Sequence, residues 1–165
     1  MRFVALIVWF VTALWGLYML AVWLIENDAT RQGNSASRLP LPVILAHVTF
    51  AVTGLAVWVT YLLLDRPLLA WVAVGILVAI AVLGLSMFAR WIPVYRMTGD
   101  EVSMPVPAGL GATAGAMTAA APQAAPQRDL PAEGSFPLLI VLAHGAFAVT
   151  TVVLVLLTAL GVGGS

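Results

Sequence analysis

Four long apolar stretches constrain this chain more than any other feature of its sequence. They cover residues 3–25, 41–64, 68–92 and 136–161 of the 165. A helix needs about 20 apolar residues to cross a bilayer, and backbone groups in lipid must be satisfied within the segment, which makes each stretch a helix. Only 8% of the residues are charged, compared with about 25% in soluble domains. We therefore expect an all-α integral membrane protein.

The composition excludes several classes of function. The chain has no cysteine, which removes disulfides, thiolate metal sites and cysteine nucleophiles. Its net charge is zero and no basic block is present, which argues against nucleic-acid binding. No Asp, Glu or Lys lies inside the apolar stretches, so a proton relay or charge-coupled transporter is not expected. All seven cations are arginine, a bias typical of GC-rich bacterial genomes, and we expect a bacterial inner (cytoplasmic) membrane location.

The connections between the stretches define two polar faces. Residues 65–67 form a tight turn that makes the second and third stretches antiparallel neighbours. Side A carries the loop 26–40 and the long connection 93–135, whereas side B carries both termini and that turn. Residues 97–135 are rich in Gly, Ala, Pro and Gln, which predicts a flexible connection. The positive-inside rule places the arginine-rich side A in the cytoplasm, but Arg2 favours the opposite orientation, and the orientation stays open.

One helical hairpin is present twice in the sequence. Residues 45–53 and 142–150 are identical at seven of nine positions, and residues 16–23 and 84–91 at five of eight. Beyond these windows the two copies share little except apolarity, so apolarity alone does not explain the matches. We predict a single membrane domain, residues 1–165, folded as an up-down four-helix bundle with a pseudo-twofold axis along the membrane normal. Its two parallel repeats are residues 3–64 and 68–161.

The only two histidines, His47 and His144, occupy matching positions inside the second and fourth stretches. Each lies about two helical turns from side A. Ionisable groups inside a membrane usually face the interior of the bundle, and the second and fourth helices of an up-down bundle are diagonal. Two imidazoles facing each other at one depth are suited to bind one haem iron from both sides. The sequence therefore predicts a metal site formed by this pair.

Neighbouring residues fit a cofactor of this kind. Helical spacing places an aromatic residue and a small residue one turn deeper in the membrane than each histidine, on the same face of its helix. Small residues on the other two helices let a flat macrocycle approach the backbone. Arginines near side A suit bidentate pairing with haem propionates. The glycines also suit plain helix packing, and an arginine at a helix end also extends to the interface without any ligand. The predicted cofactor-binding residues are Phe50, Phe147, Gly16, Gly84, Gly54, Arg38 and Arg90.

With these residues, the chain resembles the membrane b-type cytochromes, including cytochrome b561-like proteins and the haem-bearing anchors of quinone-linked dehydrogenases. The resemblance is one of architecture and rests on His47 and His144. It implies one bis-histidine haem b and electron transfer linked to the quinone pool, together with a redox partner protein or a larger membrane complex. Such relatives often carry four histidines and two haems, but this chain has histidines for one. We therefore expect an electron-transfer subunit more than an autonomous enzyme.

Other interpretations remain open. Met19 and Met87 are equivalent in the two repeats and, with the histidines, would form a soft site suited to Cu(I); Met97, Met104 and Met117 could extend a copper path. Methionine is also a common apolar filler. The histidines could be hydrogen-bonded core residues, could ligate a chlorophyll-type pigment, or could belong to a structural subunit of a membrane complex that has no cofactor of its own.

Overall fold

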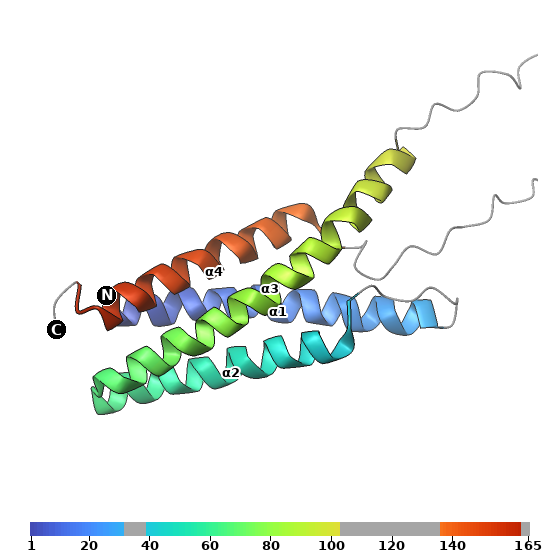
Figure 1. The fold of residues 1–165 in the computed structure, drawn as a ribbon. Helices are drawn as coiled ribbons and strands as arrows, with labels where there is room; N and C mark the ends of the chain where they lie inside the picture. The colour runs from blue at the N-terminus through green and yellow to red at the C-terminus, as the bar shows by residue number, and fades with distance from the viewer. Residues whose placement is uncertain (32–38, 103–135, 163–165) are drawn as a thin grey trace, which may run out of the picture.

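The computed structural model describes residues 1–31, 39–102 and 136–162, and within them it contains four α-helices and no strand. The helices are α1 (Arg2–Arg31), α2 (Leu41–Leu64), α3 (Pro67–Val102) and α4 (Leu138–Ala159). Figure 1 shows them as an elongated bundle whose two chain ends lie at the same end. Each helix is long and apolar enough to cross a membrane. The predicted all-α membrane bundle is confirmed, and the chain is an integral membrane protein.

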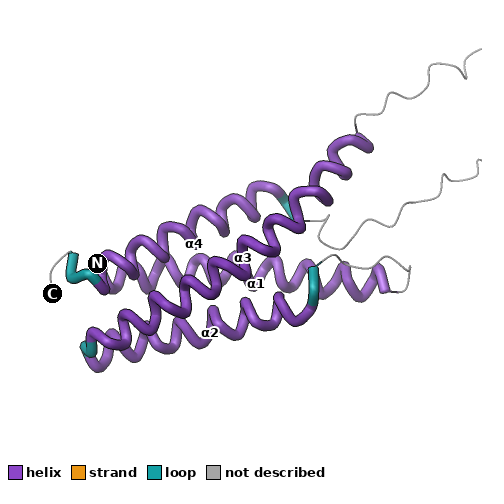
Figure 2. Tube along the Cα trace, in the orientation of Figure 1, coloured by secondary structure: helices purple, strands orange, loops and turns teal. Residues whose placement is uncertain are grey.

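Proline and one left-handed residue set the helix ends. Pro40 and Pro137 cap α2 and α4 with the same extended backbone, at φ −67° and −64°. Proline suits this position because its missing N–H would have no partner in the first turn. Asp65 ends α2 in the left-handed region, at φ 49°. This short turn brings α3 back beside α2, at the end that holds both termini (Figure 2).

Packing follows the internal repeat. α2 packs mainly on α3, and α1 mainly on α4, whereas α2 and α4 make no direct backbone contact within the described residues. When α1 is superposed on α3 and α2 on α4, the contact between α1 and α4 and the contact between α2 and α3 correspond to each other. The helices that carry the two histidines are therefore diagonal, as an up-down bundle requires.

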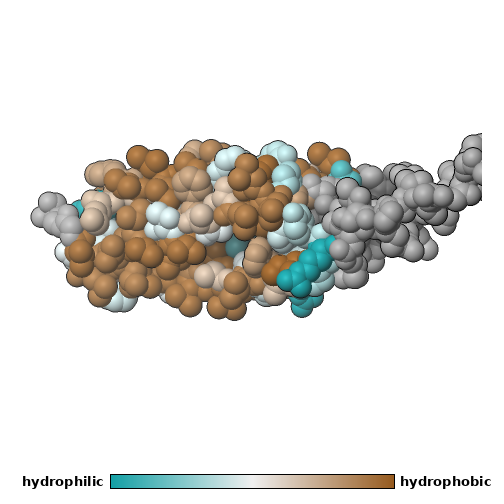
Figure 3. Space-filling model, turned by 90° about the horizontal axis from the view of Figure 1, so that it is seen from above, coloured by the Kyte–Doolittle hydropathy of each residue, from teal (hydrophilic) through white to brown (hydrophobic). Residues whose placement is uncertain are grey.

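Tryptophans fill much of the core at both ends of the bundle. Near side B, Trp9 and Trp58 lie in a cluster with their ring centres 6.4 Å apart. Near side A, Trp23 packs with Leu39 and Ile44. Many large apolar side chains remain on the outside, and Figure 3 shows them along the length of the visible face, with hydrophilic residues gathered near the side A end. This apolar outer surface suits a lipid bilayer.

Polar contacts at side B connect α1 to the turn after α2. Arg2 forms an ion pair with Asp65 at 2.7 Å, and its guanidinium lies 5.8 Å from the centre of the Tyr61 ring. The indole N–H of Trp58 donates to the Arg2 carbonyl at 3.4 Å. These contacts hold the beginning of α1 next to the end of α2.

Two helices continue beyond the spans expected from hydropathy. The first span was expected to end at residue 25, but α1 continues to Arg31. The flexible connection was expected to begin at residue 97, but α3 continues to Val102 with Pro93 inside it. Hydropathy marks where the chain leaves the apolar layer, and a helix can continue into water because its backbone groups are already paired. The remainder of the expected connection, residues 103–135, lies outside the described residues.

Candidate functional site

His47 and His144 face each other inside the side A half of the bundle. Each is seven residues beyond the proline that caps its helix, so the matching helix starts give the two side chains the same depth. Their ring centres are 6.5 Å apart and the ring planes are inclined by 55°. The structure thus brings together the two residues that the repeat predicted as a pair.

Glycines from the other two helices lie against these rings. A Cβ built on Gly16 of α1 would be 3.1 Å from Cε1 of His144, and one on Gly84 of α3 would be 3.2 Å from Cε1 of His47. Each histidine therefore lies against the glycine of the opposite repeat. Because both distances are shorter than ordinary carbon contacts of about 3.5–4.0 Å, a side chain at either position would push a ring aside.

The hydrogen bonding of the two rings differs. His144 Nδ1 lies 3.1 Å from the Thr12 carbonyl oxygen; since a carbonyl can only accept, this nitrogen carries the proton and leaves Nε2 available as a ligand. His47 Nδ1 is buried without a hydrogen-bond partner among the described residues. The Ile80 carbonyl lies close enough to influence the His47 ring, but no hydrogen bond of acceptable geometry forms.

The distance between the ring centres equals the one expected for two imidazoles on opposite sides of a metal, while Cε1 and both nitrogens of His144 lie within 4.0 Å of the Gly16 Cβ position in this structure. A metal held by an imidazole nitrogen at about 2.0–2.1 Å lies about 3.2 Å from the ring centre, so two opposed imidazoles have ring centres about 6.4 Å apart. The observed separation is 6.5 Å. The described residues contain no group of three or more His, Cys, Asp or Glu that could hold a metal, and the site offers two nitrogen donors.

Several predicted neighbours lie away from the pair. Phe50 and Phe147 are 41% and 37% exposed on the outer surface of the bundle. Gly54 is buried, but a Cβ on it would lie 2.9 Å from both Trp9 and Ile76, so its space is filled by close helix packing. Arg90 is exposed on α3, about 1.7 helical turns closer to side A than Gly84. Arg38 lies outside the described residues.

Two buried threonines were not among the predicted site residues. Thr12 and Thr151 are 8% and 2% exposed, and their hydroxyl oxygens are 3.2 Å apart between α1 and α4. Thr12 also supplies the carbonyl that accepts from His144. The signal for Thr12 was its spacing, because it lies one helical turn before Gly16 on the same face.

Met87 takes an apolar role in the structure. Met87 packs against the cluster of Trp23, Leu39 and Ile44, as an adaptable filler of a core does. Met97, Met104 and Met117 lie among residues whose side chains the structure does not describe. Met19 is half-buried on α1, and the copper alternative with Met19 and Met87 stays a prediction.

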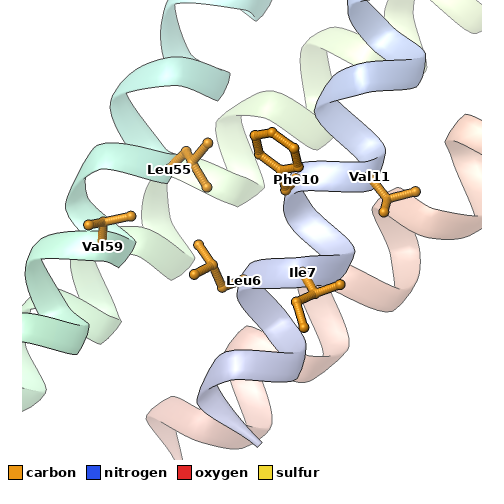
Figure 4. A pocket seen from close by; sticks show the side chains of 6 residues that line it. All are labelled: Leu6, Ile7, Phe10, Val11, Leu55 and Val59. Carbon is orange, nitrogen blue, oxygen red and sulfur yellow. The ribbon is translucent and has the colours of Figure 1, made fainter.

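A separate apolar groove of about 390 Å³ lies between α1 and α2. Figure 4 shows side chains from both helices around it. Because every lining residue is apolar, the groove suits a hydrocarbon chain and has no polar group to orient a head group. Its lining residues are Leu6, Ile7, Phe10, Val11, Leu55 and Val59.

Comparisons with protein-family models, curated protein sequences and solved structures find no match to this chain. The site is therefore interpreted from its own geometry and chemistry.

Proposed function

We propose that this protein binds one haem b through His47 and His144 and transfers electrons in the membrane, linked to the quinone pool. The observation that carries the proposal is the opposed pair of rings, 6.5 Å apart on diagonal helices. Imidazole is a good haem ligand, and an apolar bundle buries the body of a porphyrin. We further propose a bacterial inner membrane location and a redox partner protein or complex.

The glycines let the histidine rings pack close to the neighbouring helices. Gly16 and Gly84 lie at the depth of the rings, and each leaves space for the ring of the opposite repeat. The porphyrin supplies four iron ligands and the protein two, which matches a site with two nitrogen donors. When bound, this group supplies one-electron redox chemistry; the chain's own residues hold it, orient it and exclude water.

The position of the pair suggests how electrons enter or leave. Both histidines lie about two turns from side A, so a redox partner would approach from that face. Arg90 is exposed at the same end, where it could pair with a propionate as arginine does with carboxylates, and Arg38 remains a second candidate for that role. A quinone would exchange electrons with this site from within the membrane.

A difference spectrum tests the proposal directly. The full chain is expressed with ample haem, purified in detergent and measured as dithionite-reduced minus oxidised. We expect b-type bands with a stoichiometry of one haem per chain, and loss of the low-spin spectrum in both His47→Ala and His144→Ala. Val52→Ala and Val149→Ala are matched controls, because these residues lie on the same two helices and both are 65% exposed. A folded, colourless wild-type protein would refute haem binding, and metal analysis of that sample would decide copper.

A further inference from the structure

The two histidines differ in how firmly the surrounding protein holds them, although the repeat makes them equivalent. His144 donates from Nδ1 to the Thr12 carbonyl at 3.1 Å. In the other repeat Ile80 stands at the position of Thr12, and His47 Nδ1 has no hydrogen-bond partner among the described residues. When one ring nitrogen of an imidazole binds a metal, a hydrogen bond donated by its other ring nitrogen fixes the orientation of the ring and makes it a stronger ligand. The internal symmetry is therefore broken at the atoms that orient the rings.

The helices behind His144 are also tied together. The hydroxyl oxygens of Thr12 and Thr151 are 3.2 Å apart, and each hydroxyl lies 2.8 Å from a carbonyl of its own helix. Both threonines are buried, so this polar contact between α1 and α4 is shielded from water. A threonine hydroxyl has one proton, so one of the two turns from its own-helix carbonyl when it donates to the other, and this contact is made by the residue whose carbonyl accepts from His144.

The corresponding region behind His47 has no such polar contact. Gly54 stands where the second repeat has Thr151, and the space beside it is filled by Trp9 and Ile76. Ile80 carries no hydroxyl. The environment of His47 is therefore mainly apolar packing, and the Ile80 carbonyl beside the ring forms no hydrogen bond of acceptable geometry with Nδ1.

Resting on the proposed haem site, we infer that His144 is the firmly held ligand and His47 the exchangeable one. Thr151 is then a positioning residue that acts on His144 through Thr12. A small neutral ligand such as carbon monoxide would reach the iron on the α2 side, where His47 gives way. The two repeats would thus have diverged into one strong and one replaceable ligand.

The two histidine variants provide the first test. Haem-loaded His47→Ala and His144→Ala proteins are compared for the rate of haem transfer to excess apomyoglobin and for carbon monoxide binding after reduction. We expect His144→Ala to lose haem about 10-fold faster or more than His47→Ala, because only the histidine that remains in His47→Ala has a hydrogen-bonding partner, and such partners contribute about 10–100-fold to metal affinity. His47→Ala should retain haem and bind carbon monoxide fully. Equal loss from both variants, or faster loss from His47→Ala, would overturn the inference.

A second test leaves both ligands in place and so does not depend on how the alanine variants fold. Thr151→Val keeps the side-chain shape but removes the hydroxyl, and should change the low-spin spectrum and speed haem transfer several-fold; Thr151→Ser should restore both. Thr150→Val is the matched control, because Thr150 is exposed and bonds only its own helix in this structure. An unchanged spectrum in Thr151→Val would contradict the positioning role. A wild-type protein without haem would instead refute the proposed function itself.

Discussion

Glycine at positions 16 and 84 matters because of the volume that a side chain would occupy. A Cβ at either position would lie 3.1–3.2 Å from a histidine ring carbon. Gly75 and Gly145 lie on the same type of apolar helix, but a Cβ on either would meet nothing within 4 Å. The chain therefore contains two glycines that adjoin the histidine pair and two that provide controls for the general effect of glycine on helix stability.

The first prediction at this scale compares Gly84→Ala with Gly75→Ala. Both changes gain about 0.5–1 kcal/mol of helix propensity, but only Gly84→Ala displaces a ring, and overpacking costs about 1–3 kcal/mol. We expect Gly84→Ala to lower the fraction of chains that carry haem while Gly75→Ala leaves it unchanged. Haem per chain, from absorbance and protein content, is the measurement. Equal haem content in both variants would mean that the contact with His47 has no effect on the site.

Much of the histidine site could be predicted from the sequence, but its outer neighbours could not. The repeat placed His47 and His144 at one depth because matched sequences start their helices alike. Helical spacing identifies which residues share a face, but not which space a neighbouring helix already fills. Trp9 fills the space beside Gly54, and Phe50 is directed to the outer surface. Spacing within one helix cannot show either outcome.

At the scale of elements, the turn between α2 and α3 combines a strained backbone with an ion pair. Asp65 adopts φ 49°, a left-handed conformation that costs an ordinary residue about 1–2 kcal/mol and that Asp and Asn tolerate best. Its carboxylate pairs with Arg2, but the Asp65 side chain is 68% exposed. An exposed pair contributes about 0–1 kcal/mol. The conformation of the turn should therefore matter more than its charge.

This reasoning predicts different outcomes for two substitutions at one position. Asp65→Asn keeps the tolerance for the left-handed conformation and removes only the charge, so it should cost under about 1 kcal/mol. Asp65→Val introduces a β-branched residue at positive φ and should cost about 1–2 kcal/mol more. Thermal unfolding in detergent, followed by circular dichroism, measures both. Similar midpoints for the two variants would show that the backbone conformation contributes little to stability.

The ends of the helices show what hydropathy can and cannot predict about an element. The apolar stretches predicted four helices because lipid leaves the backbone no other way to pair its polar groups. The same argument does not apply outside the lipid, where water pairs with backbone groups in any conformation. α1 and α3 therefore continue for several residues beyond the expected spans, and the polar sequence alone did not indicate where they end.

At the scale of the whole molecule, the repeat determines the topology, and its divergence makes the surroundings of the two histidines unequal. Two parallel hairpins place both termini and the turn before α3 at side B. The outer surfaces of the two repeats are similarly apolar, whereas the groups inside differ: the Thr12 carbonyl accepts from His144, and His47 Nδ1 has no hydrogen-bond partner among the described residues. A duplicated scaffold can thus keep its membrane arrangement while the surroundings of its two histidines become unequal.

The topology gives the last prediction, and the absence of cysteine makes it simple to test. Arg66 lies in the turn just before α3, and Tyr95 lies near the far end of the membrane-spanning part of α3, Pro67–Arg96; both are exposed. A single cysteine is introduced as Arg66→Cys or Tyr95→Cys, and intact cells are treated with a membrane-impermeant maleimide. We expect one of the two variants to be labelled in intact cells and the other only after the membrane is opened, because an apolar helix separates the two positions. Whichever is labelled first also establishes whether side A or side B faces the cytoplasm. Labelling of both from one side would be incompatible with α3 as a spanning helix, and with the diagonal arrangement that brings His47 and His144 together.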